Sequence, residues 1–381
     1  MGGSYSASGL PSRDVRVLFT FAGGSGHVEP LVPIARAVRD AGHTVAFSGR
    51  SAVAERVREL GFEMFVTGPP GPEAPSTRTA LLEVDLEREA RVLRDGFAGR
   101  IARERAAGVL KICGAWRPDL LICGEVDFGA MVAAERAGLP FATVLISATD
   151  TFVRDEVVAE PLDALRAEHG LAPESPRDPL VLSPFPHRLR PLPRNALAFR
   201  AAPVQRPAAD ATAVYLTLGT IFNLESGDLF ERVLEGLREL PVDVVATVGR
   251  NLDPAELGPQ PANVRLERYL PQAEVLPHCR AVISHGGSGS ILGALAHGLP
   301  SVLLPMGADQ PQNAARCQEL GVARVLDAVR ATPETVREGV ADVLADPSYR
   351  SAAERIADEI AALPGPDHAV PLLEQLAARP T

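Results

Sequence analysis

The chain has 381 residues, of which 46% are hydrophobic and 23% charged, and its formal net charge is −10. This composition is ordinary for a soluble globular protein, and the length suggests two or three domains with sizeable cores. The negative charge argues against nonspecific binding to nucleic acid or to an anionic membrane as the main task. An anionic ligand would therefore have to be held by local dipoles and a few placed cations.

The cysteines and the apolar runs bear on the cellular setting. The residues up to about Arg13 are polar and rich in Gly and Ser, and they lack the apolar core of a signal peptide. No apolar run approaches the roughly 18 residues that a membrane span requires. We expect a cytoplasmic protein without stable membrane insertion. Its cysteines lack metal-ligand spacing and are expected to be reduced thiols. They are Cys113, Cys123, Cys279 and Cys317.

Short apolar runs alternate with helical patterns through the first half of the chain. Strands are predicted over 15–22, 43–48, 62–66, 119–123 and 140–146, and helices over 29–42, 52–60, 81–116 and 128–137. This alternation is typical of a parallel, doubly wound sheet. A Pro- and Gly-rich loop is expected over 68–78. Between 147 and 179 the pattern weakens, and only a helix near 162–169 is predicted.

A proline-rich stretch with little periodicity, 183–207, separates this half from the next. We predict an N-terminal α/β domain over 14–195, a linker over 196–212 and a C-terminal α/β domain over 213–360. The remaining segment, 361–381, is expected to be a helix that packs back on the first domain. Arginines in the proline-rich stretch are interpreted as part of a solvated connector, with a membrane or phosphate patch as the alternative. They are Arg188, Arg190, Arg194 and Arg200.

The alternation restarts after the linker. Strands are predicted over 213–218, 242–248, 264–266, 281–283, 301–304 and 321–326. Helices are predicted over 229–237, 272–276, 291–297, 332–345 and 352–363, with another from Pro311. The second half therefore predicts a second doubly wound domain, and the fold class is α/β with two Rossmann-like domains facing one cleft.

The stretch 280–313 is a predicted strand, glycine turn, helix and second strand. Its glycine turn joins a strand end to a helix N-terminus, where N–H groups and the helix dipole suit a phosphate. Asp309 and Gln310 follow the second strand and would face the same crevice. A tight connection without ligand is the alternative for the turn alone.

His27 is the titratable side chain of the loop after the first strand, which reads Gly23-Gly24-Ser25-Gly26-His27. Its imidazole could take a proton from an acceptor hydroxyl at neutral pH. Alternatively, it could cap the following helix. A base in one half and a phosphate site in the other would make a complete group-transfer site.

These motifs together resemble the family 1 glycosyltransferases of the GT-B fold, which include bacterial natural-product enzymes. The resemblance covers most of the chain. It is carried by Gly26-His27 with Pro30, Thr217–Thr220, Tyr269–Gln272, His285–Ser290, Gly298–Val302, and Asp309-Gln310 with Asn313.

The resemblance implies a role for each motif. His27 would be the base of an inverting transfer that needs no metal and no other cofactor. Tyr269 would stack on the pyrimidine, the main chain of Leu270 would read its edge, and Gln272 would lie near the ribose. Asp309 and Gln310 would bind sugar hydroxyls, although capping the next helix is an alternative for them. Diphosphate binding would fall to Gly219, Thr220, His285, Gly287, Ser288, Gly289 and Ser290.

Two positions depart from the family pattern. Members that use UDP-sugars carry a Glu where this chain has Gly293, and that carboxylate binds the ribose hydroxyls. Its absence favours a dTDP-sugar over a UDP-sugar as donor. The carboxylate that usually orients the base would fall at Gly124, so Glu125 or Asp127 is expected to replace it, with Glu125 ranked first.

The resulting hypothesis is transfer of a deoxysugar from a dTDP- or UDP-sugar to a small-molecule acceptor such as a polyketide. The acceptor is expected near the segments after Val66 and after Ser147, and a homodimer is retained as a hypothesis. A nicotinamide-dependent oxidoreductase is a second class, but the Gly-x-Gly-x-x-Gly pattern fails at Glu29. A non-catalytic, transferase-like partner is a third, against which His27 and Asp309-Gln310 argue.

Overall fold

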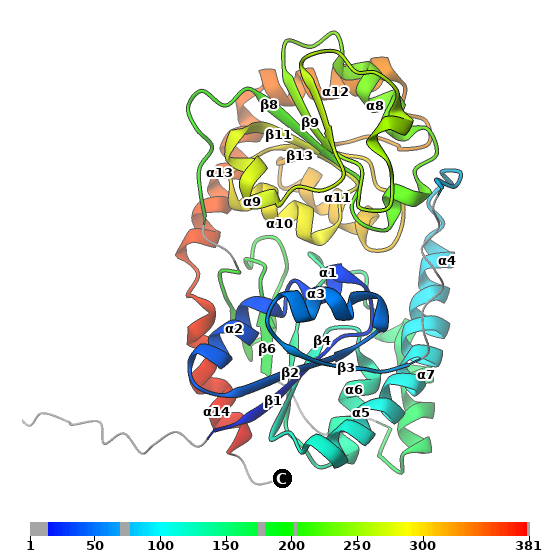
Figure 1. The fold of residues 1–381 in the computed structure, drawn as a ribbon, viewed down its shortest axis with the longest axis vertical. Helices are drawn as coiled ribbons and strands as arrows, with labels where there is room; N and C mark the ends of the chain where they lie inside the picture. The colour runs from blue at the N-terminus through cyan, green and yellow to red at the C-terminus, as the bar shows by residue number, and fades with distance from the viewer. Residues whose placement is uncertain (1–13, 69–76, 174–179, 202–203, 379–381) are drawn as a thin grey trace, which may run out of the picture.

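A computed structural model describes residues 14–68, 77–173, 180–201 and 204–378. Two parallel sheets, one from each half of the chain, form two α/β units arranged along the long axis of the molecule (Figure 1). The predicted pair of doubly wound domains is confirmed. The stretch 1–13 and most of the loop predicted over 68–78 lie outside the described residues.

The first sheet has seven strands in the order β3-β2-β1-β4-β5-β6-β7, and all of its pairings are parallel. The strand bounds are β1 (Arg16–Thr20), β2 (Thr44–Gly49), β3 (Glu63–Val66), β4 (Leu120–Gly124), β5 (Phe141–Val144), β6 (Leu180–Ser183) and β7 (Ala196–Ala198). The two central strands are buried on both faces, which is why they appear in the sequence as continuous apolar runs.

Helices cover both faces of this sheet and connect its strands. They are α1 (Ser25–Val28), α2 (Val32–Asp40), η1 (Ser51–Val53), α3 (Ala54–Glu59), α4 (Leu86–Arg91), η2 (Val92–Ile101), α5 (Ala102–Trp116), α6 (Phe128–Arg136) and α7 (Asp155–Glu168). The segment predicted to be helical over 81–116 consists of α4, η2 and α5. Of these, η2 is a π-helix. Helix α7 begins seven residues before the predicted helix.

The second sheet has six parallel strands in the order β10-β9-β8-β11-β12-β13. Its strands are β8 (Ala213–Thr217), β9 (Asp243–Thr247), β10 (Val264–Glu267), β11 (Cys279–Ser284), β12 (Ser301–Leu303) and β13 (Ala323–Val325). Its helices are η3 (Phe222–Glu225), α8 (Leu229–Leu237), η4 (Pro254–Leu257), α9 (Gln272–Val275), η5 (Leu276–His278), α10 (Ser288–Ala296), α11 (Gln310–Glu319), α12 (Pro333–Ala345) and α13 (Pro347–Ala362).

The proline-rich stretch holds more structure than was predicted. Strand β7 extends the first sheet at residues assigned to the linker, and β6 was not predicted at all. The interpretation of the arginines as solvated is wrong for Arg190, which is 7% exposed and pairs with buried Glu125. Such short strands next to prolines have no apolar periodicity long enough to detect.

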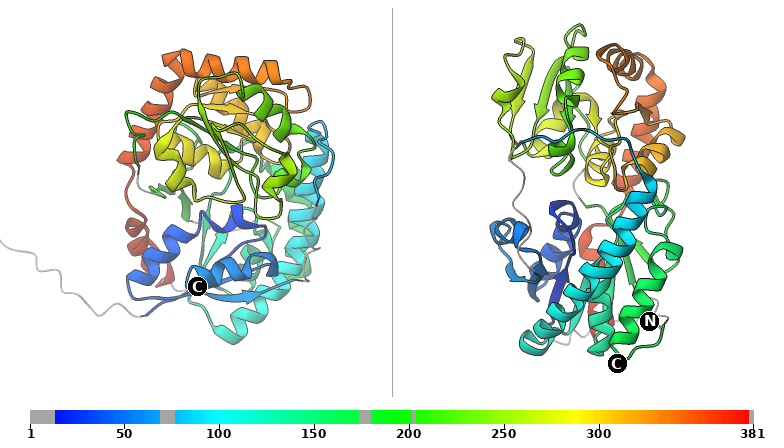
Figure 2. Two further views of the ribbon diagram at one scale, coloured as in Figure 1. Left: turned by 45° about the horizontal axis from the view of Figure 1, so that its top comes forward. Right: turned by 90° about the vertical axis from the view of Figure 1, so that its right-hand side faces the viewer.

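The two halves share contacts on both sides of the molecule. On one side, the segment before α4 reaches the C-terminal half (Figures 1 and 2). There the N–H of Thr79 donates to the carbonyl of Leu224 at 2.7 Å, and Arg78 pairs with Glu231 at 2.5 Å. On the other side, η6 (Pro366–Ala369) and α14 (Val370–Ala377) follow α13 back to the first half. Val370 of α14 lies in the core of that half.

All four cysteines are free and buried. Among the described residues, no helix combines the length and the apolar character that crossing a membrane requires.

Candidate functional site

His27 lies just beyond β1, a central strand of the first sheet, in the short helix α1. Its ring rests on the main chain of Gly23, where an added Cβ would overlap the imidazole. The ring of Phe97 lies parallel to the imidazole, with centroids 5.7 Å apart and an interplanar angle of 6°. Parts of the residue remain accessible to solvent, but neighbouring groups enclose the ring. This burial lowers the pKa of His27 to about 4, and the carboxylate of Asp127 opposes the shift. His27 is therefore neutral at physiological pH, as a proton acceptor must be.

Both carboxylates that follow β4 are held by buried arginines. Glu125 pairs with Arg190 at 2.5 Å and accepts hydrogen bonds from the N–H groups of Ile146 and Ser147. These contacts argue against the ranking of Glu125 as the first candidate for orienting His27. Sequence reasoning could not find them, because Arg190 arrives from the proline-rich stretch.

Asp127 is the carboxylate whose charge acts on His27. It is 1% exposed, and Arg105 of α5 pairs with it at 2.7 Å. The same guanidinium also donates to the hydroxyls of Ser48 and Thr67. Asp127 is thus held in place by Arg105. The sequence predicted that Glu125 or Asp127 orients His27. It did not indicate that Arg105 is buried, because the helix of Arg105 is rich in charged residues.

His285 lies directly after β11 in the second sheet. Its Nε2 faces the main chains of two loops: a Cβ on Gly219 would lie 2.6 Å from it, and one on Gly287 would overlap it. Burial lowers the pKa of His285 to about 4, partly opposed by the backbone of Thr217. Nδ1 is buried and has no hydrogen-bond partner among the described residues. Nε2 lies between the two glycine loops.

The N-terminus of α10 faces the same region. Its N-cap is Gly287, which offers no side-chain acceptor, so the first N–H groups of Ser288, Gly289 and Ser290 are not capped by that residue. Thr220, which follows Gly219 after β8, is exposed. Gly219 has φ of 79°, a conformation that favours glycine. The structure thus brings together the predicted diphosphate-binding residues at the carboxyl ends of β8 and β11.

Ser288 also connects the two halves. Its Oγ accepts a hydrogen bond from the N–H of Ala148, after β5, at 2.6 Å and donates to Oδ2 of Asp309 at 2.6 Å. Asn313 donates to the same Asp309 oxygen at 2.8 Å. Burial raises the pKa of Asp309, and the hydrogen bond from Ser288 opposes this effect. The loop after β5 and the loop before α11 therefore meet at Ser288.

The residues predicted to bind the sugar begin α11. Asp309 is the N-cap residue, but its side chain makes no capping hydrogen bond, so capping does not explain it. Gln310 is 2% exposed, and its Oε1 accepts from the N–H of Met306 at 2.9 Å. Ala308, just before them, has φ of 51°. Its N–H bonds the carboxylate of Glu89 from α4 of the first half. Sequence reasoning missed Glu89, which stands in a charged run without a motif.

The predicted nucleotide-binding segment lies after β10. Tyr269 is 43% exposed, and the guanidinium of Arg250 lies 3.9 Å from the centre of its ring. Leu270 is partly buried against the neighbouring core. Gln272 begins α9, and its Nε2 lies 3.5 Å from Oγ of Ser290, at the limit of a hydrogen bond. One face of the Tyr269 ring is thus occupied by a cation.

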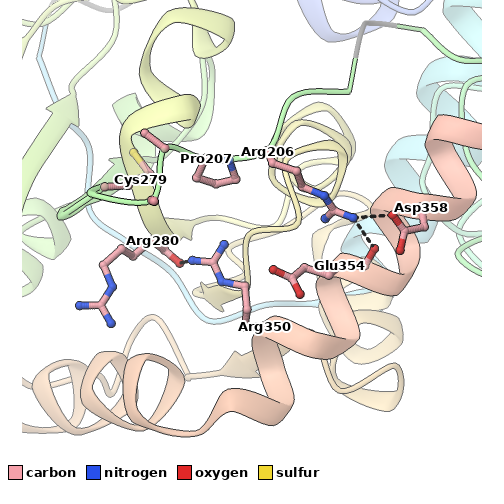
Figure 3. Close-up of a pocket in the computed structure, with 10 residues that line it drawn as sticks. Arg206, Pro207, Cys279, Arg280, Arg350, Glu354 and Asp358 are labelled. Atoms are coloured by element: carbon pink, nitrogen blue, oxygen red, sulfur yellow. Dashed lines mark hydrogen bonds and ion pairs between the residues drawn. The ribbon is translucent and has the colours of Figure 1, made fainter.

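A hollow of about 450 Å³ lies elsewhere, between the connector and α13 (Figure 3). Two of its arginines are paired within the protein. Arg206 pairs with Asp358 at 2.5 Å, and Arg350 donates to the carbonyls of Gly298 and Arg280. None of the predicted site residues lines this hollow.

Known proteins match both the sequence and the fold. Residues 231–376 match the family described as erythromycin biosynthesis protein CIII-like, C-terminal domain. The L-demethylnoviosyl transferase of Streptomyces niveus is 30% identical over 92% of this chain and 96% of its own. The TDP-daunosamine transferase DnrS of Streptomyces peucetius is 29% identical over 96% of this chain and 97% of its own.

Solved structures agree with this assignment. The glycosyltransferase VinC, crystallised in complex with DTDP, superposes with a TM-score of 0.74 at 25% identity, covering 96% of this chain and 100% of that one. The expected GT-B architecture is confirmed. The chain is a glycosyltransferase and belongs to the family 1 glycosyltransferases of the GT-B fold that serve bacterial natural-product biosynthesis.

Proposed function

We propose that this glycosyltransferase moves a deoxysugar from a dTDP-sugar to a hydroxyl of a small-molecule aglycone such as a polyketide, with inversion and without a metal ion. The observation that carries the proposal is the placement of two neutral histidines at the strand ends of the two halves. The TDP-daunosamine transferase and the DTDP complex of VinC support the nucleotide. The erythromycin-related family description supports the class of acceptor.

His27 would accept the proton of the acceptor hydroxyl. The freed oxygen then bonds to the anomeric carbon, and the bond from that carbon to the diphosphate oxygen breaks. The electron pair of the broken bond leaves with the nucleoside diphosphate. Attack from the side opposite the leaving group inverts the anomeric configuration. Asp127 would stabilise the imidazolium that forms, because its charge raises the proton affinity of His27.

The diphosphate would be bound by the N-terminus of α10 and the N–H of His285. An uncapped helix N-terminus carries free N–H donors and the positive end of the dipole. Donors aimed at the departing oxygen stabilise the charge that develops on it. In other transferases a divalent cation stabilises this charge, and here these groups would do so instead. Transfer should therefore persist after EDTA treatment, and loss of activity restored by Mg²⁺ would refute this part of the proposal.

The choice of nucleotide depends on the space beside position 293. A Cβ on Gly293 would lie 2.7 Å from Oε1 of Gln272 and 3.4 Å from Leu276. A glutamate for the ribose hydroxyls therefore does not fit while Gln272 holds this place. With no carboxylate to satisfy, a 2′-deoxyribose leaves no buried charge unpaired.

The test pairs dTDP- and UDP-forms of one sugar with a panel of aglycones and detects product by mass spectrometry. We expect a higher kcat/KM with the dTDP form and an inverted linkage by NMR. Equal or better turnover of the UDP form would contradict the assignment of the nucleotide.

A further inference from the structure

The helical run after α4 contains a π-helix, η2, at residues 92–101. π-Helical turns are rare and frequently mark functional sites, because the extra residue per turn redirects side chains. Here Leu93, Ala98 and Ile101 are buried in the protein. Leu93 and Ala98 pack in an apolar cluster with Val126 and Val158. Phe97 is only partly buried at the edge of that cluster and extends to His27.

The imidazole of His27 contacts both Phe97 and Gly23. The ring of Phe97 lies nearly parallel to the imidazole, inclined by only 6°. The main chain of Gly23 lies so close that a methyl group there would overlap the imidazole. Parallel stacking at a centroid separation of 5.7 Å fixes the plane of the ring as well as its position. Rotation of His27 would require either Phe97 or the first loop to move.

The charged groups around His27 do not by themselves explain its lowered pKa. Asp127, from the loop after β4, favours the imidazolium, and Arg105 of α5 pairs with Asp127. The other carboxylate of that loop, Glu125, is paired with Arg190. Exclusion of water is the larger effect and acts in the opposite direction. Phe97 provides an apolar face of that enclosure.

We propose that Phe97 is a positioning residue for the base: its ring holds the imidazole of His27 in one plane and keeps water from it. Phe97 exchanges no proton. The proposal rests on the role of His27 given above, but its structural content is the contact between the two rings. Removing the aromatic ring should release the imidazole into water and return its pKa toward the ordinary value of about 6.5.

The test is an NMR titration of histidine Cε1–H signals between pH 5 and 8 in the full-length protein. The chain has eight histidines, and the signal of His27 is identified by its loss in His27→Ala. In the parent protein and in Phe97→Tyr, His27 should not titrate in this window. In Phe97→Ala it should titrate near pH 6. Leu93→Ala is the matched control, because Leu93 lies on the same π-helix and in the same cluster, and it should leave His27 neutral.

Kinetics provide a second readout. For Phe97→Ala, kcat/KM should fall by up to about 10-fold between pH 8 and pH 5.5, as a pKa near 6.5 requires, and the parent should change little. An unshifted His27 in Phe97→Ala, or an equal shift in Leu93→Ala, would overturn the proposal. If His27 shifts but its removal leaves transfer intact, the positioning contact stands and the role of His27 as base fails.

Discussion

His27 and His285 form a natural comparison between the two halves. Each follows a central strand of its sheet, each packs on glycine main chain, and burial lowers the pKa of each to about 4. Their electrostatic surroundings differ. The carboxylate of Asp127 acts on His27, whereas His285 lies beside the N-terminus of α10.

This difference separates the roles of the two rings. Burial makes both histidines neutral, but a nearby carboxylate favours the imidazolium and a helix N-terminus disfavours it. Under the proposed function, His27 is therefore the ring that gains a proton during the reaction. Under the same proposal, His285 remains neutral and donates a hydrogen bond to the diphosphate.

Among variants that test this comparison, His27→Ala is expected to lose the most activity. Loss of a general base should lower kcat by about 10²- to 10⁴-fold. Single-turnover assays with saturating donor and acceptor measure this change. A variant that retains full kcat would show that the proton goes elsewhere.

A smaller loss is expected from Gly23→Ala, because the added methyl group overlaps the imidazole and displaces it. A displacement of about 1 Å costs roughly 100-fold in rate. The KM for the donor should stay unchanged, since the proposed donor site lies in the other half. Gly26→Ala is the control: it lies in the same loop, and a Cβ there meets no atom within 4 Å. Equal losses in the two variants would mean that the loop, and not the ring, is responsible.

The smallest effect concerns Glu89, which links the first half to the loop of Asp309. Glu89→Ala removes the acceptor for the N–H of Ala308, and one hydrogen bond of about 0.5–1.5 kcal/mol corresponds to a 2- to 10-fold rise in the KM for the donor. Glu89→Gln keeps an acceptor and should restore the KM. Glu87→Ala serves as the control, because the Glu87 side chain on the same helix is 92% exposed. An unchanged KM in Glu89→Ala would show that Glu89 does not position the loop of Asp309 for donor binding.

Much of the fold was predictable because its signals are local. Buried parallel strands appear as apolar runs, and the glycine turns mark the loops of His27 and His285. Strands β6 and β7 were missed because they are short and surrounded by prolines. The sequence predicted where single motif residues lie. It did not predict which side chains contact them.

Those partners come from distant segments. Arg105 and Arg190 look like solvent-exposed charges in the sequence, yet both are buried against carboxylates that follow β4. Phe97 belongs to a helical run whose change to a π-helix leaves no pattern that sequence periodicity detects. Three-dimensional packing, which local propensity does not encode, decides these contacts.

Calorimetric titration of dTDP into the parent, His27→Ala and His285→Ala tests the division between the histidines most directly. We predict that His27→Ala binds dTDP like the parent, because its ring belongs to the first half and not to the proposed nucleotide site. His285→Ala should bind about 10- to 100-fold more weakly, as loss of a hydrogen bond to a charged group costs about 1.5–3 kcal/mol. Parent-like binding by His285→Ala, or weakened binding by His27→Ala, would contradict the account.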